Sequence, residues 1–188
     1  MNLNTLLEKY KIKANLNMLL EMWNEPHRSY HNLNHLVDLT NMINSDYANS
    51  KINQVTAEKL LLTSLFHDII YDPTRTDNEV KSAEFFLNLC TEKKDIHILD
   101  IKQAILDTAT HTCDNYLSER FNKYDMNIVE RDFDSLLEWE KGIWFEYSNV
   151  CDKKAYKEGR TKFLESIVDK YPLNSANLSK LVEMVKNF

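Results

Sequence analysis

The chain contains few of the residues that interrupt helices. Only 2 glycines and 3 prolines occur among its 188 residues. Glycine-rich phosphate loops and tight hairpins need glycine, because they use backbone conformations that other residues avoid. The shortage therefore argues against both kinds of structure. We therefore expect an all-α protein. A chain of this length buries roughly 70% of its unfolded surface without disulfides or a structural metal, so we expect a single domain over residues 1–188.

Long apolar runs and clusters of positive charge are also missing. No stretch approaches the roughly 18 apolar residues of a membrane span, and the first residues lack the order of a secretory signal. The net charge is −6 and basic residues never run longer than a pair, so neither a membrane nor a nucleic acid is an expected partner. Cys90, Cys113 and Cys151 lack a CxxC spacing, which is typical of free thiols in a reducing compartment. We therefore expect a soluble, cytoplasmic protein.

Apolar residues repeat at helical spacing along most of the chain. Pro26, Pro73 and Pro172 are expected to end three of the helices, because proline removes a helical hydrogen bond. The pattern predicts helices over residues 3–23, 32–47, 56–71, 76–90, 95–109 and 135–171, the last of them interrupted between residues 142 and 152.

Three helix starts carry capping signals. Thr76 with Glu79, and Ser135 with Glu138, fit the capping-box pattern, and Asp95 fits an N-cap.

The most informative motif is the dipeptide His67-Asp68, inside the apolar segment LTSLFHDIIYDP. Burying an ionised carboxylate without a partner is costly, and a divalent cation is the simplest compensation. His31 and His35 are four residues apart, so both rings project from one helix face, and His35 shares an apolar stripe that we expect to face the core. A single histidine is ordinarily a core or surface residue, but this clustering favours a metal site.

Five segments of the sequence resemble the HD-domain superfamily, and in particular its predicted metal-dependent HD phosphohydrolases. They read RSYHNLNHL, FHDIIYDPTRTDNEVKSA, ATH, DMN and YKEGR, and together they span residues 28–160. The dipeptide alone is a weak signal, since it occurs by chance in many proteins, whereas five ordered segments are more specific. The resemblance implies an HD-type helical bundle with the metal site between its helices.

The resemblance also assigns metal ligands. His35, His67 and Asp68 match three of the family's four usual ligands, and the fourth is an aspartate on a later helix. We choose Asp125, because the family's DxD segment here reads DMN and only its first position is acidic. Three other aspartates are alternatives that also suit helix caps or solvated positions: Asp72, Asp114 and Asp132.

Two imidazoles and two carboxylates make a mixed nitrogen and oxygen site with two negative charges. Such a site suits Mn²⁺, Fe²⁺, Co²⁺, Ni²⁺ or Mg²⁺ more than a thiolate-preferring ion. An octahedral ion would keep positions for water and a phosphoryl oxygen, and would lower the pKa of that water. Asp68 is therefore expected to be catalytic as well as a metal ligand, and the hydrolysis needs no covalent intermediate.

Two further histidines are catalytic candidates. His31 lies in a YHN segment similar to that of the cyclic nucleotide phosphodiesterases, relatives within the superfamily, which implies that it protonates the leaving oxygen. Its simpler interpretation is a helix cap or a surface histidine. His111 is predicted at or just beyond a helix end, where it could complete a second metal site, contact phosphate or only complement the helix dipole.

Arg28, Lys81 and Arg160 are candidate ligands for a substrate phosphate. Each taken alone is more simply a solvated surface charge. The chain departs from the family where relatives carry an arginine before an acidic-tyrosine pair, since GIWFEY offers Trp144 and Phe145 there. These rings could stack on a nucleobase, although core positions are the commoner use of aromatic residues at helical spacing.

The sequence thus predicts a metal-dependent phosphohydrolase acting on a small phosphoester, with a nucleotide as the leading substrate and a divalent metal ion as cofactor. A non-catalytic nucleotide or metal sensor is the alternative, and a structural helical protein with incidental histidines is the third. A homo-oligomer is compatible with each of them.

Overall fold

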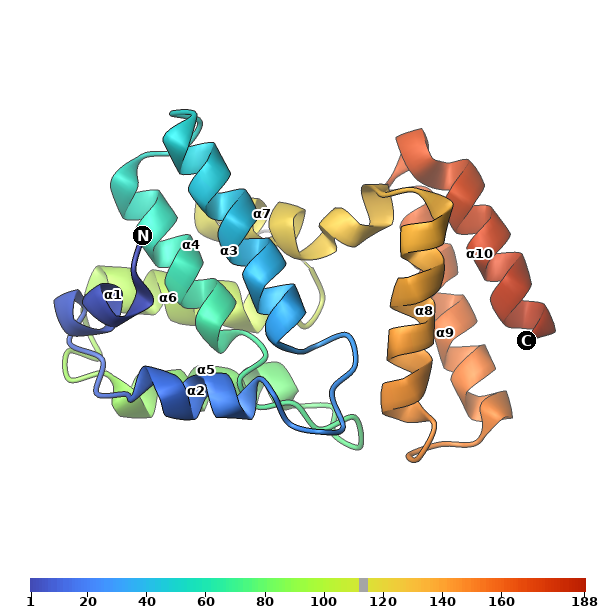
Figure 1. Ribbon diagram of the computed structural model, residues 1–188, viewed down its shortest axis with the longest axis horizontal. Coiled ribbons are helices and arrows are strands. Elements are labelled where there is room, and N and C mark those ends of the chain that lie inside the picture. The colour runs from blue at the N-terminus through green and yellow to red at the C-terminus, as the bar shows by residue number, and fades with distance from the viewer. Residues whose placement is uncertain (112–114) are drawn as a thin grey trace. The chain divides into compact units, whose positions relative to one another are not determined.

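The protein is all-α, as its composition predicts. The computed structural model describes residues 1–111 and 115–188, and within these ranges the regular structure is helical (Figure 1). The exception is one isolated bridge between Ile12 and Cys90. No helix in the described ranges is both long and apolar enough to cross a membrane.

Two compact units make up the chain, Met1–Asp125 and Met126–Phe188. The prediction of one domain over residues 1–188 stays a prediction. The helices of the first unit are α1 (Leu3–Lys9), α2 (Leu16–Met22), α3 (Leu33–Ala48), α4 (Gln54–Phe66), α5 (Asn78–Leu89), α6 (Ile96–Asp107) and α7 (Tyr116–Asp125). The second unit contains η1 (Met126–Glu130), α8 (Phe133–Tyr147), α9 (Lys153–Val168), η2 (Pro172–Asn174) and α10 (Ser175–Asn187).

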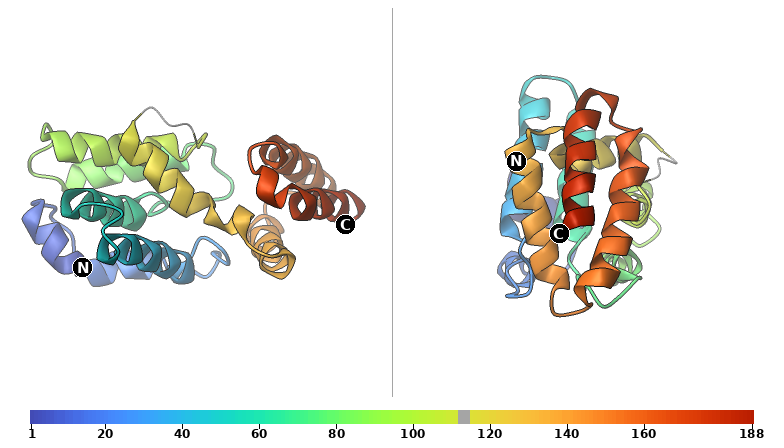
Figure 2. Two further views of the ribbon diagram at one scale, coloured as in Figure 1. Left: turned by 90° about the horizontal axis from the view of Figure 1, so that it is seen from above. Right: turned by 90° about the vertical axis from the view of Figure 1, so that its right-hand side faces the viewer.

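Helix α4 is the central helix of the first unit. It packs against α1, α3, α5, α6 and α7, with α1 and α3 on one side of it and α5 and α6 on the other (Figure 2, left). Ten of its thirteen residues are buried, because its apolar residues occupy all faces of the helix rather than one stripe. The residues that follow α4, His67 and Asp68, are therefore placed in the interior of the unit.

The predicted helix over residues 3–23 is wrong in its middle. Lys11 adopts a left-handed backbone with φ of 53°, and the backbone N–H of Lys13 donates to the carbonyl of Leu89 at the end of α5. The chain restarts as α2 after Asn15, whose side chain accepts from the backbone N–H groups of the first turn. Apolar periodicity did not reveal this break, because the backbone partner lies on a distant helix.

Two other helix boundaries differ from the predictions by five residues each. Helix α4 ends at Phe66, five residues before the expected end, and α8 continues through Gly142 to Tyr147. Helices α7 and α10 were not predicted from the sequence.

The capping signals have mixed outcomes. Asp95 is the N-cap of α6, as predicted. Thr76 does not cap α5, which begins after Asp77. Ser135 lies inside α8, where its backbone N–H donates to the carboxylate of Asp132, the actual N-cap. In both wrong cases an aspartate directly before the helix holds the cap position, and of the two only Asp132 makes a side-chain capping bond.

Candidate metal centre

The four predicted metal ligands lie together inside the first unit. His35 comes from α3, His67 and Asp68 from the end of α4, and Asp125 from the last residue of α7. One ligand atom from each of His35, His67 and Asp68 lies within 4.8 Å of the others. Oδ1 of Asp125 lies 3.1 Å from Nε2 of His35 and 3.5 Å from Nε2 of His67. Helices distant in sequence thus bring two imidazoles and two carboxylates to one point.

His67 presents one ring nitrogen to this point. Its Nδ1 lies 3.0 Å from the backbone carbonyl of Ser64, which can only accept, so Nδ1 carries a proton and donates. Its Nε2 is buried without a hydrogen-bond partner, although Oδ2 of Asp68 lies 3.1 Å away. A buried polar atom without a partner is costly. The geometry therefore fits a cation that Nε2 and the carboxylates would share, as in other sites where the second ring nitrogen orients a histidine ligand.

Burial and charge act against each other at these residues. Burial lowers the pKa of His67, but the negative charges of Asp68 and then Asp125 outweigh it and raise the pKa to about 10. Burial alone would raise the pKa of Asp68, yet the charge of His67, helped by that of His31, holds it below its usual range. Hydrogen bonds from His111 and His35 likewise overcome burial and hold the pKa of Asp125 well below its usual range. The site therefore attracts a positive charge.

Aromatic rings pack against the two histidines of the cluster. Trp23 lies 5.5 Å and Phe121 5.0 Å from the ring of His67, measured between centroids, and Tyr30 lies 5.0 Å from the ring of His35. These walls keep water away from the inner side of the cluster, which strengthens its electrostatic interactions.

His31 and His111 both lie beside the cluster. The half-buried ring of His31 is 6.2 Å from that of His35, and its charge lowers the pKa of Asp68. Nε2 of His111 lies 3.3 Å from Oδ2 of Asp125, on the carboxylate oxygen that does not face His35. His111 is just past the end of α6, as predicted, with φ of 50° and 28% of its side chain exposed.

The three predicted phosphate ligands have other partners. Arg28 is completely buried, and each of its side-chain nitrogens is engaged by a carbonyl or by Glu25, which argues against a phosphate role. Lys81 pairs with Glu84 along α5, with 41% of its side chain exposed. Arg160 belongs to the second unit, where its Nε donates to Glu140 at 2.8 Å. Each of the three therefore has a partner within its own unit.

The alternative fourth ligands have capping or turn roles where they are described. Asp72 accepts hydrogen bonds from the backbone N–H and hydroxyl of Thr74, and Asp132 caps α8. Asp114 lies outside the described residues, as does Cys113.

The aromatic pair of α8 is divided between two environments. Trp144 packs against Tyr156 at 4.8 Å and Phe188 at 5.4 Å between centroids, within the second unit. Phe145 is 52% exposed, so the expected core position is wrong for this ring.

Sequence reasoning missed the residues that support the cluster. Trp23 donates from Nε1 to the carbonyl of Leu65 at 2.9 Å, and the hydroxyl of Ser118 on α7 donates to the buried carboxylate of Asp107 on α6. The apolar spacing around Phe121 was the available signal for α7, but the polar residues of that segment concealed it.

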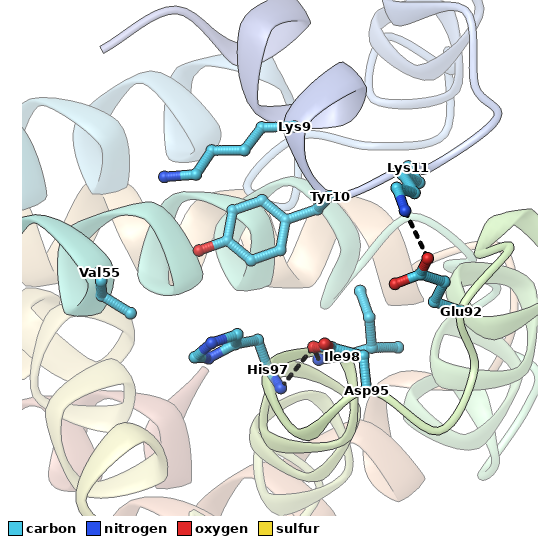
Figure 3. A pocket seen from close by; sticks show the side chains of 8 residues that line it. All are labelled: Lys9, Tyr10, Lys11, Val55, Glu92, Asp95, His97 and Ile98. Atoms are coloured by element: carbon cyan, nitrogen blue, oxygen red, sulfur yellow. Dashed lines mark hydrogen bonds and ion pairs between the residues drawn. The ribbon is translucent and has the colours of Figure 1, made fainter.

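A separate pocket of about 220 Å³ lies near the ends of α1 and the starts of α4 and α6 (Figure 3). Its charged groups have partners in the protein: Lys9 pairs with Glu58, Lys11 with Glu92, and Asp95 caps α6. None of the predicted site residues lines it. The histidine and aspartate cluster is therefore the stronger candidate for function.

Comparisons with protein families, with curated proteins and with solved structures find no match to this chain.

Proposed function

We propose that this protein is a metal-dependent phosphohydrolase of the HD type. The observation that carries the proposal is the buried Nε2 of His67, which lacks a hydrogen-bond partner and faces the carboxylates of Asp68 and Asp125. His35, His67, Asp68 and Asp125 would hold the ion, and their donor set suits Mn²⁺, Fe²⁺, Co²⁺, Ni²⁺ or Mg²⁺. A divalent ion there would activate water and polarise a phosphoryl group.

The side chains around the cluster have separate tasks in this proposal. His31 donates a proton to the leaving oxygen, because it is the half-buried histidine beside Asp68. His111 binds the outer oxygen of Asp125 and keeps the other oxygen turned toward His35. The rings of Trp23 and Phe121 exclude water from the inner wall.

The proposed substrate is a small phosphoester, with a nucleotide as the leading candidate. We also propose a cytoplasmic location, because Cys90 and Cys151 are free thiols. A sensor that binds the metal or nucleotide without hydrolysis is the competing function, and the same experiment separates the two.

The experiment compares His31→Gln with His27→Gln. His27 is a matched control in the same loop, since it is exposed and bonds to the carbonyl of Tyr71. We expect His31→Gln to keep its metal and to lose roughly 10²- to 10⁴-fold in turnover of an alkyl phosphoester. The loss on p-nitrophenyl phosphate should be much smaller, because its phenolate leaves without a proton. His27→Gln should match the wild type on both.

Two results would count against this mechanism. Equal losses on both esters at full metal occupancy would remove the acid role from His31. No phosphate release by the metal-loaded wild type, from either ester or from a panel of nucleotides, would favour the sensor.

A further inference from the structure

We propose that Arg28 is a positioning residue that joins the proton donor His31 and the metal ligand Asp68 into one rigid unit. The inference rests on the proposed function and assigns the arginine a role other than the phosphate contact expected from the sequence.

The guanidinium of Arg28 binds backbone from both sides of the site. Its Nη1 donates to the carbonyl of Asp68 at 2.7 Å and to the carbonyl of His31 at 3.2 Å. Its Nη2 donates to the carbonyl of Ile69 at 3.1 Å. Nε donates to Glu25 Oε2 at 3.0 Å, and Nη2 lies 2.9 Å from the same oxygen. With 0% of the side chain exposed, these contacts are the arginine's main interactions.

The end of α4 explains why such a residue is needed. A helix leaves its last carbonyls without amide partners, and α4 ends in the interior at Phe66, two residues before Asp68. Trp23 satisfies the carbonyl of Leu65 in the last turn of α4, and Arg28 satisfies the carbonyls of Asp68 and Ile69 in the turn that follows the helix. The side chains of Trp23 and Arg28 thus donate the hydrogen bonds that fix the turn containing Asp68.

The same guanidinium lies close to two aromatic rings. Its central carbon is 5.5 Å from the ring of Trp23 and 5.3 Å from that of Tyr71. Trp23 also packs against His67, and Tyr71 packs against His31 with 4.4 Å between centroids. A displacement of Arg28 would therefore reach both the ligand pair and the proton donor.

Only arginine fits this arrangement. Its planar fork reaches several acceptors in fixed directions, whereas lysine offers one compact ammonium on a flexible stem. Arg28→Lys keeps the positive charge but cannot hold the carbonyls of His31, Asp68 and Ile69 together. The expected consequence is a looser Asp68 carboxylate, a weaker metal site and a less well placed His31.

Cobalt binding to the full chain tests this role. Arg28→Lys is compared with Arg75→Lys, which changes a surface arginine paired with Asp77. We expect Arg28→Lys to bind Co²⁺ at least about 10-fold more weakly, as for other residues that orient ligands. The visible absorption per bound Co²⁺ should also change, which a purely structural defect would not cause. Arg75→Lys should match the wild type in both measurements.

A second variant keeps the test decisive if Arg28→Lys does not fold. Glu25→Ala removes the carboxylate that anchors the guanidinium, from a side chain that is 41% exposed, and should weaken Co²⁺ binding several-fold without unfolding the protein. Wild-type Co²⁺ affinity and spectrum in the folded Arg28→Lys variant, or in Glu25→Ala where Arg28→Lys is unfolded, would overturn the positioning role alone. A wild-type protein that binds no Co²⁺ would overturn the metal site itself, and the positioning role with it.

Discussion

The metal-free site holds a proton where the cation is proposed to bind, so apparent metal affinity should depend steeply on pH. Burial lowers the pKa of His67, but Asp68 and Asp125 outweigh it and raise the pKa to about 10. Below that pH, Nε2 carries a proton that is held by the charges of Asp68 and Asp125, 3.1 Å and 3.5 Å away, without a well-aligned hydrogen bond, and the metal must displace it. The pKa values of the two carboxyls lie below their usual range, so neither carboxyl takes up a proton near neutral pH.

The size of the effect follows from the pKa of His67. Each pH unit below the pKa adds about 1.4 kcal/mol to the cost of displacing the proton. At pH 7 the cost is roughly 4 kcal/mol, since the pKa of about 10 lies three units higher. We therefore expect the apparent Co²⁺ affinity to rise about tenfold per pH unit between about pH 6 and 8.5, with about one proton released from His67 per ion.

Two assays measure this dependence. Competition with a chelator gives the affinity at each pH, and isothermal titration calorimetry in two buffers of different ionisation enthalpy counts the protons. His27→Gln is the control, because it removes an exposed histidine outside the cluster and should keep the same slope. A constant affinity across this pH range, with no proton released, would show that His67 is neutral in the metal-free site and would refute the reasoning.

Three further changes test other parts of the structure. Asp125→Asn should weaken metal binding by more than the roughly 10- to 100-fold that is typical when a residue that only orients a ligand is replaced. An unchanged affinity in a competition titration would place the fourth ligand elsewhere. Glu58→Gln should cost about 1–3 kcal/mol of unfolding free energy at pH 7, because hydrogen bonds led by that of Lys9 overcome burial and lower the pKa of Glu58. Because the pKa of Glu58 is lowered in the folded protein, its contribution to stability is present above the ordinary pKa of 4.5 and is lost as the pH falls. Urea unfolding near pH 3 should therefore show little difference between the variant and the wild type. An equal difference in unfolding free energy at both pH values would contradict the assignment. Ser118→Ala leaves the buried carboxylate of Asp107 without its hydroxyl partner and should lower the unfolding free energy by about 1–3 kcal/mol, whereas an unchanged melting temperature would show that this bond does not hold α7 on α6.

The sequence was informative where a local pattern carried the physical constraint. The apolar residues of α4 predicted a buried helix, and the charged dipeptide at its end predicted that His67 and Asp68 lie in the interior, where His67 is 1% exposed. The position of His35 on an apolar stripe predicted that it faces the core, and it is buried. Only the resemblance indicated Asp125, because no local pattern links it to residues on other helices.

Contacts to distant backbone were not predictable in this way. Arg28 lies three residues before His31, which suggested a position near the site but not its partners. Those partners are carbonyls, and every residue has one, so the sequence contains no signal for them. The break after α1 has the same cause, since Lys13 bonds to the backbone of Leu89.

Metal content is the most direct test of the proposed centre. Purified wild-type protein, loaded with Co²⁺ and separated from free metal, should retain about one ion per chain by elemental analysis, because two imidazoles and two carboxylates converge on one point. His67→Ala and Asp68→Ala should each lose that ion while their circular dichroism stays helical, since a core of this size folds without a metal. Equal metal content in the wild type and in both folded variants would contradict the account.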